Sequence, residues 1–524
     1  MIKNFKWLLL VSLTFVACNN NDEEAVVEQP VTAGTANFSK YVALGNSLTS
    51  GYSDNALFKK GQENSYANIM ATQFKLVGGG DFKIPYMNDN VGGLLFNGMA
   101  NPDPDVFGRR LYLQGFSNST PPSPNIIKVS GPSTTDVFNS IASAGPYNNT
   151  GVPGAKSFHL LSSTYGSLAG LATIPPTANP YYVRFAPNGT TSILAYAVSQ
   201  NPTFFSLWIG NNDVLGYGTS GGDGTDPITP AATFEAVYTI LVNTLTGGSA
   251  KGVVANIPYV NSVPFFTTVP HNPLTARVLG RGDEAVGTAT INALNTQLYG
   301  PLKQALTAFA AGDRINLLST TGSNPLLIKD ESLPNLSAQL TAAFTPTLGA
   351  STAAFYGNVF GQARQATKAD LVLLTTQSAI ATAPTAMNSG LGFAPPAPLD
   401  KFGITYPLQD KYVLIPTEIV ELKTATDAYN TTIKSLADAK GLAFVDANAL
   451  LTQIANGGIR FGNYHLSSSF ITGGAFSLDG IHPSPRGYAL LANKFLEAIN
   501  AKYGSTFKPV DLGAYNIQYP GTIN

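Results

Sequence analysis

Four short apolar segments without polar alternation constrain the fold of this chain more than any other feature. They span residues 41–44, 203–209, 251–257 and 442–445. A strand that is apolar on both faces has to be covered on both faces, which is typical of a parallel sheet between layers of helices. Parallel neighbours also need long crossover connections, and helical patterns separate these segments. We therefore predict an α/β fold with three layers (α/β/α) around a short parallel sheet.

Amphipathic helices are predicted between and after these strands. One begins near Asn64 or Ser65 and another ends at Gly441. Ser484 is a good N-cap for the last long helix, with Pro485 at its first position. Apolar residues recur at helical spacing in each of the three: Tyr66, Ile69, Met70 and Phe74; Tyr429, Ile433 and Leu436; Tyr488, Leu491, Phe495 and Ile499.

Two long segments rich in Gly, Pro, Ser, Thr and Asn interrupt the α/β pattern, at about 78–148 and 260–410. We interpret them as large loop and helical insertions in one domain, 38–510, because residues that could do chemistry lie on both sides of them. A helical pattern over 291–309 indicates that the second insertion could form a cap. Residues 511–524 are expected to be a C-terminal tail.

The N-terminus carries signals for export. Residues 7–16 form a mostly apolar run after two lysines, which is too short to span a bilayer. With a small residue before the only cysteine, this region resembles a bacterial lipobox. It predicts a lipoprotein signal peptide over 1–18, with Cys18 as the lipidated residue. An ordinary secretory peptide with an incidental cysteine is the alternative.

A polar tether is predicted over 19–37, and it begins with the acidic run 19–24. Such a run resembles the surface-export signal of Bacteroidota lipoproteins, although a solvated spacer would look the same. We therefore expect a protein of the cell envelope that is attached to a membrane through a lipid anchor. The resemblance favours the outer membrane, with exposure at the cell surface as one alternative and the membrane face left open.

The charge balance excludes several classes of function. There are 30 Lys and Arg against 31 Asp and Glu, with no basic stripe, so we expect no nucleic-acid partner. No two of the four histidines lie three or four residues apart, and we expect no metal and no organic cofactor. The acidic segments 103–105 and 223–226 could suggest calcium, but turn residues explain them better.

Four segments carry residues that could do chemistry. Ser47 lies just beyond the first predicted strand, where a helix cap is the ordinary interpretation. Asp479 precedes His482 by three residues across a turn, so its carboxylate could accept a hydrogen bond from the ring Nδ1. That arrangement would leave Nε2 free to take a proton from a hydroxyl. A surface turn is the alternative.

The other two segments could supply hydrogen-bond donors. Asn212 follows the strand that ends at Ile209, and its amide could point into a site at the carboxyl edge of the sheet. Gly154 lies in a Gly-Pro turn where no side chain would block access to the backbone N–H. A helix cap and a plain turn are the alternatives.

In this chain order, Ser, Gly, Asn and Asp-x-x-His, the four segments resemble the blocks of the SGNH (GDSL) hydrolase family. The resemblance implies a three-layer, flavodoxin-like fold with a five-stranded sheet. It also implies that Ser47 is the nucleophile, His482 the general base and Asp479 the residue that orients it. Ser47 N–H, Gly154 N–H and the Asn212 amide would form the oxyanion hole. Asn46 stands where the family has Asp, which concerns local hydrogen bonding.

The resemblance predicts a serine esterase or lipase that cleaves carboxylic esters through an acyl-enzyme. Substrates could be lipid acyl esters, with the insertions forming an apolar groove, or acetylated carbohydrates. Aromatic residues of the second insertion would suit either an acyl chain or a sugar ring: Phe355, Tyr356, Phe360 and Phe393. The remaining histidines are expected to be structural: His159, His271 and His465. A surface binding lipoprotein without catalysis is the alternative from another class.

Overall fold

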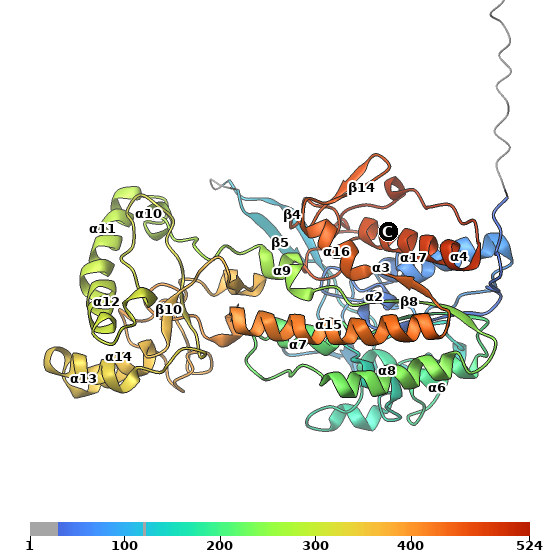
Figure 1. The fold of residues 1–524 in the computed structure, drawn as a ribbon, viewed down its shortest axis with the longest axis horizontal. Helices are drawn as coiled ribbons and strands as arrows, with labels where there is room; N and C mark the ends of the chain where they lie inside the picture. The colour runs from blue at the N-terminus through green and yellow to red at the C-terminus, as the bar shows by residue number, and fades with distance from the viewer. Residues whose placement is uncertain (1–29, 119–121, 524) are drawn as a thin grey trace, which may run out of the picture.

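The computed structural model describes residues 30–118 and 122–523, and this part of the chain contains a mixed sheet-and-helix fold around five parallel strands (Figure 1). The strand order is β13-β8-β7-β1-β6, and every neighbouring pair is parallel. The strands are β1 (Tyr41–Gly45), β6 (Asn149–Gly151), β7 (Phe204–Trp208), β8 (Lys251–Ala255) and β13 (Ala443–Val445). The predicted signal peptide, 1–18, and the lipidation residue Cys18 lie outside the described residues.

Four of these strands confirm the apolar segments, whereas β6 was not predicted. Its sequence, Asn149-Thr150-Gly151, is polar and yet completely buried. The Asn149 amide donates to the carbonyl of Thr49 (2.8 Å), and the Thr150 hydroxyl donates to the carbonyl of Ala43 (2.8 Å). Because backbone acceptors satisfy both side chains, the strand needs no apolar residues and has no apolar signal in the sequence.

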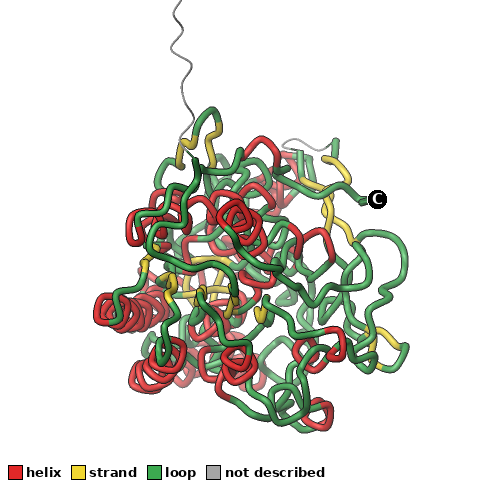
Figure 2. The backbone as a smooth tube through the Cα atoms, turned by 90° about the vertical axis from the view of Figure 1, so that its right-hand side faces the viewer, coloured by secondary structure: helices red, strands yellow, loops and turns green. Residues whose placement is uncertain are grey.

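Helices flank the sheet, and the strands lie between them in Figure 2. Helix α4 (Tyr66–Phe74) packs against α17 (Pro485–Tyr503), and α8 (Ala231–Leu245) packs against α6 (Ile193–Ser199) and α15 (Pro416–Ala439). The predicted cap at Ser484 is confirmed, since its side chain accepts from Gly487 N–H, and the helix predicted to begin near Asn64 or Ser65 is capped by Ser65, which accepts from Asn68 N–H. The α/β prediction is therefore correct at the level of a parallel sheet flanked by helices.

Within the described residues, no helix has both the length and the apolar character needed to cross a membrane.

Short elements complete the part of the fold that surrounds the sheet. The short helices are α2 (Ser47–Ser50), α3 (Lys59–Glu63), α5 (Pro180–Val183), α7 (Asn212–Thr219), α9 (Pro264–Thr267) and α16 (Ala447–Ala455). The paired short strands are β2 (Leu95–Phe96) with β3 (Met99–Ala100), β4 (Leu111–Phe116) with β5 (Pro124–Lys128), and β14 (Ile459–Phe461) with β15 (Tyr464–Leu466).

Both ends of the described chain pack onto the domain. In the segment predicted as a tether, Thr35 N–H donates to the carbonyl of Tyr503 at the end of α17 (2.8 Å). In the predicted C-terminal tail, Tyr519 is buried and the carbonyl of Pro520 accepts a hydrogen bond from Arg110 Nη2 (2.7 Å). The part of the tether from residue 30 onwards and the tail up to residue 523 thus belong to the folded body.

The second predicted insertion forms a lobe with its own hydrophobic core, which we call the inserted lobe (residues 269–415). It projects from the sheet domain beyond the N-terminal end of α15 (Figure 1). The predicted helical pattern over 291–309 is present as α11, a π turn over Asn295–Tyr299, and α12. The elements of the lobe are α10 (Ala276–Leu279), α11 (Glu284–Leu294), α12 (Gly300–Thr307), α13 (Ser337–Leu348), α14 (Ala350–Phe360), β9 (Leu327–Lys329), β10 (Ala363–Gln365), β11 (Leu371–Val372) and β12 (Val413–Leu414).

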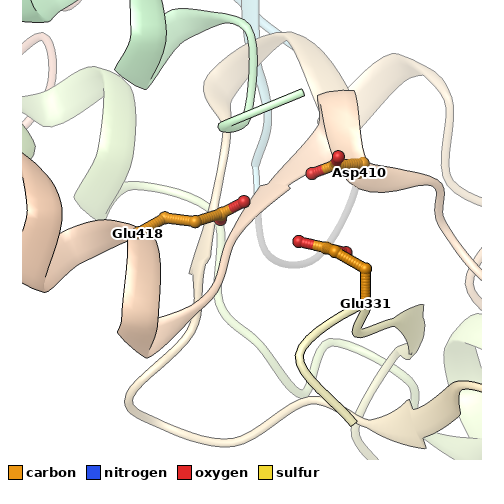
Figure 3. Close-up of side chains that lie close together, drawn as sticks. All are labelled: Glu331, Asp410 and Glu418. Atoms are coloured by element: carbon orange, nitrogen blue, oxygen red, sulfur yellow. The ribbon is translucent and has the colours of Figure 1, made fainter. Parts of the chain in front are cut away.

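Three carboxyl groups meet where the inserted lobe joins α15 (Figure 3). Glu331 and Asp410 come from the lobe and Glu418 from the first turn of α15, and their oxygen atoms lie within 4.8 Å of one another. Burial and the neighbouring carboxylates raise the pKa of Asp410 to about 7 and that of Glu418 to about 9. Like charges this close favour the protonated forms, so the group retains protons near neutral pH.

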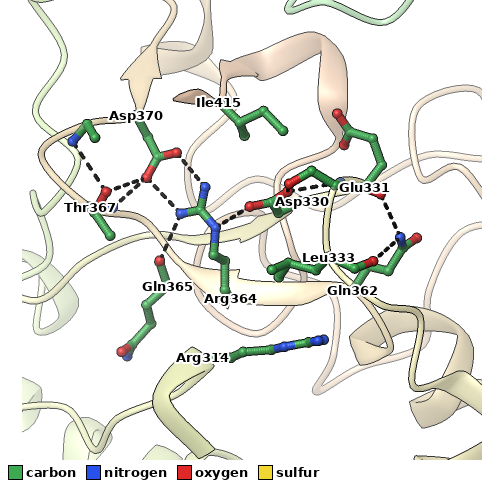
Figure 4. Close-up of polar contacts among 12 residues, drawn as sticks. Arg314, Asp330, Glu331, Leu333, Gln362, Arg364, Gln365, Thr367, Asp370 and Ile415 are labelled. Atoms are coloured by element: carbon green, nitrogen blue, oxygen red, sulfur yellow. Dashed lines mark hydrogen bonds and ion pairs between the residues drawn. The ribbon is translucent and has the colours of Figure 1, made fainter. Parts of the chain in front are cut away.

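A buried ion-pair network stabilises the inserted lobe (Figure 4). The Arg364 guanidinium donates from Nε to Asp330 Oδ2 (2.5 Å) and from Nη1 and Nη2 to the two oxygens of Asp370 (2.7 and 2.6 Å). The Arg364 side chain is 13% exposed and that of Asp370 is fully buried. Two carboxylates around one guanidinium satisfy its planar donor set, but they make the network sensitive to loss of a partner.

The replacement Asp370→Ala should lower the free energy of unfolding by about 3–5 kcal/mol, because it leaves the buried Arg364 charge incompletely paired. Asp438→Ala is the matched control, since it breaks the exposed Lys434–Asp438 pair on α15 and should cost less than about 1 kcal/mol. Urea denaturation of both variants measures the difference. Equal losses would contradict the role assigned to the network.

Candidate active site

Three of the residues predicted for the site follow the carboxyl ends of three neighbouring strands. Gly45 at the end of β1 is in register with Gly151 of β6 and with Trp208 of β7. Ser47 lies two residues beyond β1, Gly154 three beyond β6 and Asn212 four beyond β7. Because the strands are parallel, these three residues lie at one edge of the sheet, where open α/β sheets bind their ligands.

Asn46 holds the turn that presents Ser47. It is completely buried. Its side-chain oxygen accepts a hydrogen bond from Leu48 N–H (3.0 Å), which caps α2, and its amide nitrogen donates to Asn211 Oδ1 (3.3 Å). An aspartate could accept from Leu48 but could not donate to Asn211. Asparagine at this position therefore links the turn after β1 to the turn after β7.

Ser47, His482 and Asp479 form a continuous hydrogen-bonded chain. His482 Nε2 lies 2.9 Å from Ser47 Oγ, and His482 Nδ1 lies 3.0 Å from Asp479 Oδ2. Ser47 and His482 are 435 positions apart in the sequence. The structure thus brings the predicted serine together with the predicted Asp-x-x-His pair, in the order that the proton transfer in a serine hydrolase requires.

Hydrogen bonds and charge keep Asp479 ionised. Its Oδ1 accepts from Ile481 N–H (2.8 Å) and His482 N–H (2.8 Å), and its Oδ2 accepts from Asn55 N–H (2.9 Å). Burial acts to raise the pKa of this carboxyl, but the interaction with His482 and these hydrogen bonds outweigh it and lower the pKa to about 2. A carboxylate fixed in this way holds the imidazole in one tautomer and orientation.

The turn that carries Asp479 and His482 is held by segments far away in the sequence. Gly480 has a φ of 73°, and an added Cβ would come within 3.0 Å of Phe265 N. The carbonyl of Gly480 accepts a hydrogen bond from Phe265 N–H (2.9 Å) at the start of α9. On the other side, the Ser53 hydroxyl donates to the carbonyl of Pro483 (3.1 Å). Glycine is needed at position 480 for both its conformation and the close approach of α9.

The turns after β1, β6 and β7 each offer one hydrogen-bond donor. Within the described part of the chain, no hydrogen bond is found from the N–H of Ser47 or of Gly154 to another protein group. Gly154 is exposed and has a φ of 79°. The Asn212 amide nitrogen donates to the carbonyl of Ala155 (2.9 Å), which fixes the side chain and leaves its second N–H free for a ligand. These groups could stabilise a negatively charged oxygen next to Ser47.

Two contributors to the site were not predicted from the sequence. Asn55 acts through its backbone N–H, and its φ of 62° is a left-handed conformation that favours asparagine or glycine. Tyr52 packs its ring against the imidazole of His482, with ring centres 4.6 Å apart. Neither contact has a sequence signal, because both depend on how the segment after β1 meets a turn more than 400 positions later.

The other imidazoles lie apart from this chain of hydrogen bonds. His159 stacks on Tyr165, and its Nδ1 accepts from Lys156 N–H (3.0 Å). Burial and the Lys156 charge lower the pKa of His159 to about 4. His465 Nε2 contacts the carbonyl of Gly457 (2.9 Å). Among the described residues, the only group of acidic, His or Cys side chains that could hold a metal ion is Glu331, Asp410 and Glu418, which lies at the lobe junction.

A mainly apolar cavity opens beside Ser47 and His482, with a volume of about 90 Å³ open to the centres of water molecules. Its walls come chiefly from α16, from the start of α17 and from the segment after β8, and not from the inserted lobe. The aromatic residues predicted to line a substrate groove, Phe355, Tyr356, Phe360 and Phe393, instead contact one another or the core of the lobe. Of the predicted insertions, only the start of the second lines this cavity, through Val260 and Val263.

Comparison of the chain with protein-family models, with curated proteins and with solved structures found no match. The interpretation of the site therefore depends on its geometry and on the sequence pattern.

Asp479 should make the stability of the fold depend on pH at the acid end. Its pKa of about 2 in the folded state lies below the ordinary value of 3.8. Its contribution is therefore present above the ordinary value and is lost as the pH falls through the folded value. This difference in pKa corresponds to a loss of about 2 kcal/mol in the free energy of unfolding as the pH falls from about 4 to about 2.

Urea unfolding at several pH values measures this contribution. Asp479→Asn should flatten the pH dependence of the unfolding free energy in that window. Asp438→Asn, which changes an exposed carboxylate on α15, should leave it as in the wild type. An unchanged slope in Asp479→Asn would refute the assigned ionisation.

Proposed function

We propose that this protein is a serine esterase or lipase that hydrolyses carboxylic esters through an acyl-enzyme. The single observation that carries the proposal is the chain Ser47 Oγ–His482 Nε2–Asp479, with distances of 2.9 and 3.0 Å. A serine hydroxyl is a weak nucleophile unless an adjacent base accepts its proton. Here the base is within hydrogen-bond reach and is itself oriented by a buried carboxylate.

The first half of the reaction acylates Ser47. Its Oγ attacks the ester carbonyl carbon while His482 Nε2 takes the hydroxyl proton. The carbonyl oxygen becomes negatively charged, and it is stabilised by the N–H groups of Ser47 and Gly154 and by the Asn212 amide. When the tetrahedral intermediate collapses, the bond to the alcohol oxygen breaks, and His482 returns the proton to the leaving alcohol.

The second half releases the acid. A water molecule gives a proton to His482 and attacks the acyl carbon, and the oxyanion forms again in the same place. The bond to Ser47 Oγ then breaks and the serine recovers its proton from His482. Asp479 stays ionised throughout, because its role is to stabilise the imidazolium and not to accept a proton.

The proposal includes membership of the SGNH (GDSL) hydrolase family and its three-layer arrangement. Two observations favour it: the contacts of α4 with α17 and of α8 with α6 and α15, and the order of the four blocks along the chain. Asn46 departs from the family pattern, but its hydrogen bonds to Leu48 and Asn211 give it a defined role in the turn. We also propose the lipid anchor at Cys18 and a location in the cell envelope, on the sequence pattern alone.

Two alternatives remain as competing proposals. A carbohydrate O-acetyl esterase would use the same residues on a small acyl group. A surface binding lipoprotein would have no need for Ser47, His482 and Asp479 to be joined in this order, and this geometry argues against it. The acyl-chain length of the substrate separates the two enzymatic possibilities.

Ser47→Ala and His482→Ala should each lower kcat on aryl esters by at least about 10³-fold while the fold survives, because the nucleophile or its base is lost. Asn212→Ala should lower kcat by about 10²–10³-fold, as expected for one oxyanion donor. A fluorophosphonate probe should label the wild type at Ser47 and should not label Ser47→Ala. Circular dichroism and urea unfolding check that the variants are folded.

Asn448→Ala provides a control outside the proposed machinery, since Asn448 lies on the other side of β8 from Ser47 in a polar groove with Asn256 and Asp446. It should retain wild-type kcat. Near-wild-type turnover in either Ser47→Ala or His482→Ala would remove the proposed mechanism.

A further inference from the structure

The cavity beside Ser47 is lined by side chains that make it an almost purely apolar space. Leu450, Leu451 and Ile454 of α16 face Leu490 of α17 across it, and all four are buried. Val260 and Val263, from the segment after β8, form a third wall. Half-buried apolar residues stand near the reacting groups: Leu48, Leu215, Phe476 and Ile481. A cavity of this kind binds a ligand mainly by excluding its surface from water.

Polar groups of this cavity lie at one end only. They are contiguous through the Asn46–Asn211 and Ser47–His482 hydrogen bonds and through chain neighbours: Asn46, Ser47, Asn211, Asn212 and His482. The α16 wall offers no charged side chain. A sugar ring carries hydroxyl groups around its edge, and burying them here would leave them without hydrogen-bond partners, at a cost of about 1–3 kcal/mol each. A hydrocarbon chain has no such cost.

We propose that this cavity binds an unbranched hydrocarbon chain of the ester substrate, with α16 and α17 as its walls. The inference rests on the proposed ester hydrolysis and narrows it to esters that carry an alkyl chain of several carbons. The chain can belong to the acid or to the alcohol, because both substituents of the reacting carbonyl group lie next to Ser47. Substrates in which both substituents are small would leave the cavity unfilled.

The first test compares two pairs of esters. Within each pair only the length of one alkyl chain differs, and that chain belongs to the acid in one pair and to the alcohol in the other. Each methylene that becomes buried in the transition state should raise kcat/KM about fourfold. Aryl octanoate should therefore exceed aryl acetate by on the order of 100-fold or more if the acid carries the chain. Octyl acetate should exceed ethyl acetate by a similar factor if the alcohol carries it.

A second test needs no catalysis. The chain contains two tryptophans, Trp7 and Trp208, and Trp208 lines the cavity. In the full-length protein with the replacements Trp7→Phe and Ser47→Ala, Trp208 is the only tryptophan. A brominated fatty acid that enters the cavity should quench its emission in a saturable way, whereas bromide ions should not.

Variants that fill the cavity supply the control for both tests. Ile454→Phe and Val260→Phe narrow it from two different walls, and each should abolish quenching and reduce the octyl-chain preference at least tenfold. Thr452→Phe places the same ring on the exposed face of α16 and should behave as the wild type. Two filling variants are used because overpacking one wall can itself destabilise the fold.

The outcomes separate the inference from the function on which it rests. Hydrolysis confined to acetates of short alcohols, without quenching of Trp208, would overturn the hydrocarbon assignment and leave the esterase proposal intact. Quenching that the filling variants abolish, with no hydrolysis of any ester, would sustain the assignment and overturn the esterase proposal.

A second inference comes from Asp54, a carboxyl that the mechanism does not use. Asp54 is 1% exposed, and its Oδ2 has no hydrogen-bond partner among the described residues. Its Oδ1 accepts from Leu478 N–H (3.0 Å), and its own N–H donates to Ser477 Oγ (3.0 Å). It thus contacts both residues that precede Asp479.

We infer that Asp54 is a positioning residue, which holds the Asp479 turn and places a second ionisable group next to it. Burial and the nearby Asp479 raise the pKa of Asp54 to about 7, and Leu478 N–H and Arg110 oppose that rise. Arg110, Asp479 and Tyr519 are the charged or titratable groups that interact with it. When Asp54 ionises, it adds a second negative charge next to Asp479.

Asp54→Asn tests this role, because the amide oxygen can keep the bond to Leu478 while the ionisable group is lost. Because a negative charge next to Asp479 is lost, the acid limb of the kcat/KM profile should move to lower pH. The unfolding free energy should also lose the decline between about pH 4 and pH 7 that a buried carboxyl with a raised pKa causes. A purely structural role predicts that neither changes, and that result would overturn the inference.

Discussion

The parallel register of β6, β1 and β7 is the constraint on which the site depends. Gly45 is in register with Gly151 on one side and with Trp208 on the other, so the three strands end together. The turns that follow them are short, and each presents one group at the same edge. A slip of one residue in either pairing would turn the neighbouring side chains to the opposite face and would separate the donors from Ser47.

The buried carboxylate of Asp479 connects this edge to the C-terminal part of the chain. Three backbone N–H groups and the imidazole of His482 converge on it, and one of those N–H groups belongs to Asn55, just after β1. The first strand and the last turn are therefore joined by hydrogen bonds to one charge. The cost of burying that charge is offset by its four partners, which is why its pKa is lowered in spite of burial.

The inserted lobe and the apolar cavity are built from different parts of the chain. The lobe has its own apolar core and its own ion-pair network around Arg364. Just before the lobe, Phe265 N–H donates to the carbonyl of Gly480. The apolar cavity beside Ser47 is built from α16, α17 and the segment after β8, all of which belong to the sheet domain. The segment that leads into the lobe therefore supports the turn that carries Asp479 and His482, while the sheet domain itself surrounds the apolar cavity.

The sequence by itself determined the four apolar strands and the cap at Ser484, and it predicted the candidate site residues Ser47, Gly154, Asn212, Asp479 and His482. These features are local, because a strand, a cap or an Asp-x-x-His turn is specified by residues a few positions apart. Only the tertiary structure decided that Ser47 and His482, 435 positions apart, lie 2.9 Å from each other. It also decided the polar strand β6, the roles of Asn55 and Tyr52, and the walls of the cavity. Those depend on backbone groups and on packing between distant segments, and neither leaves a pattern in the order of the residues.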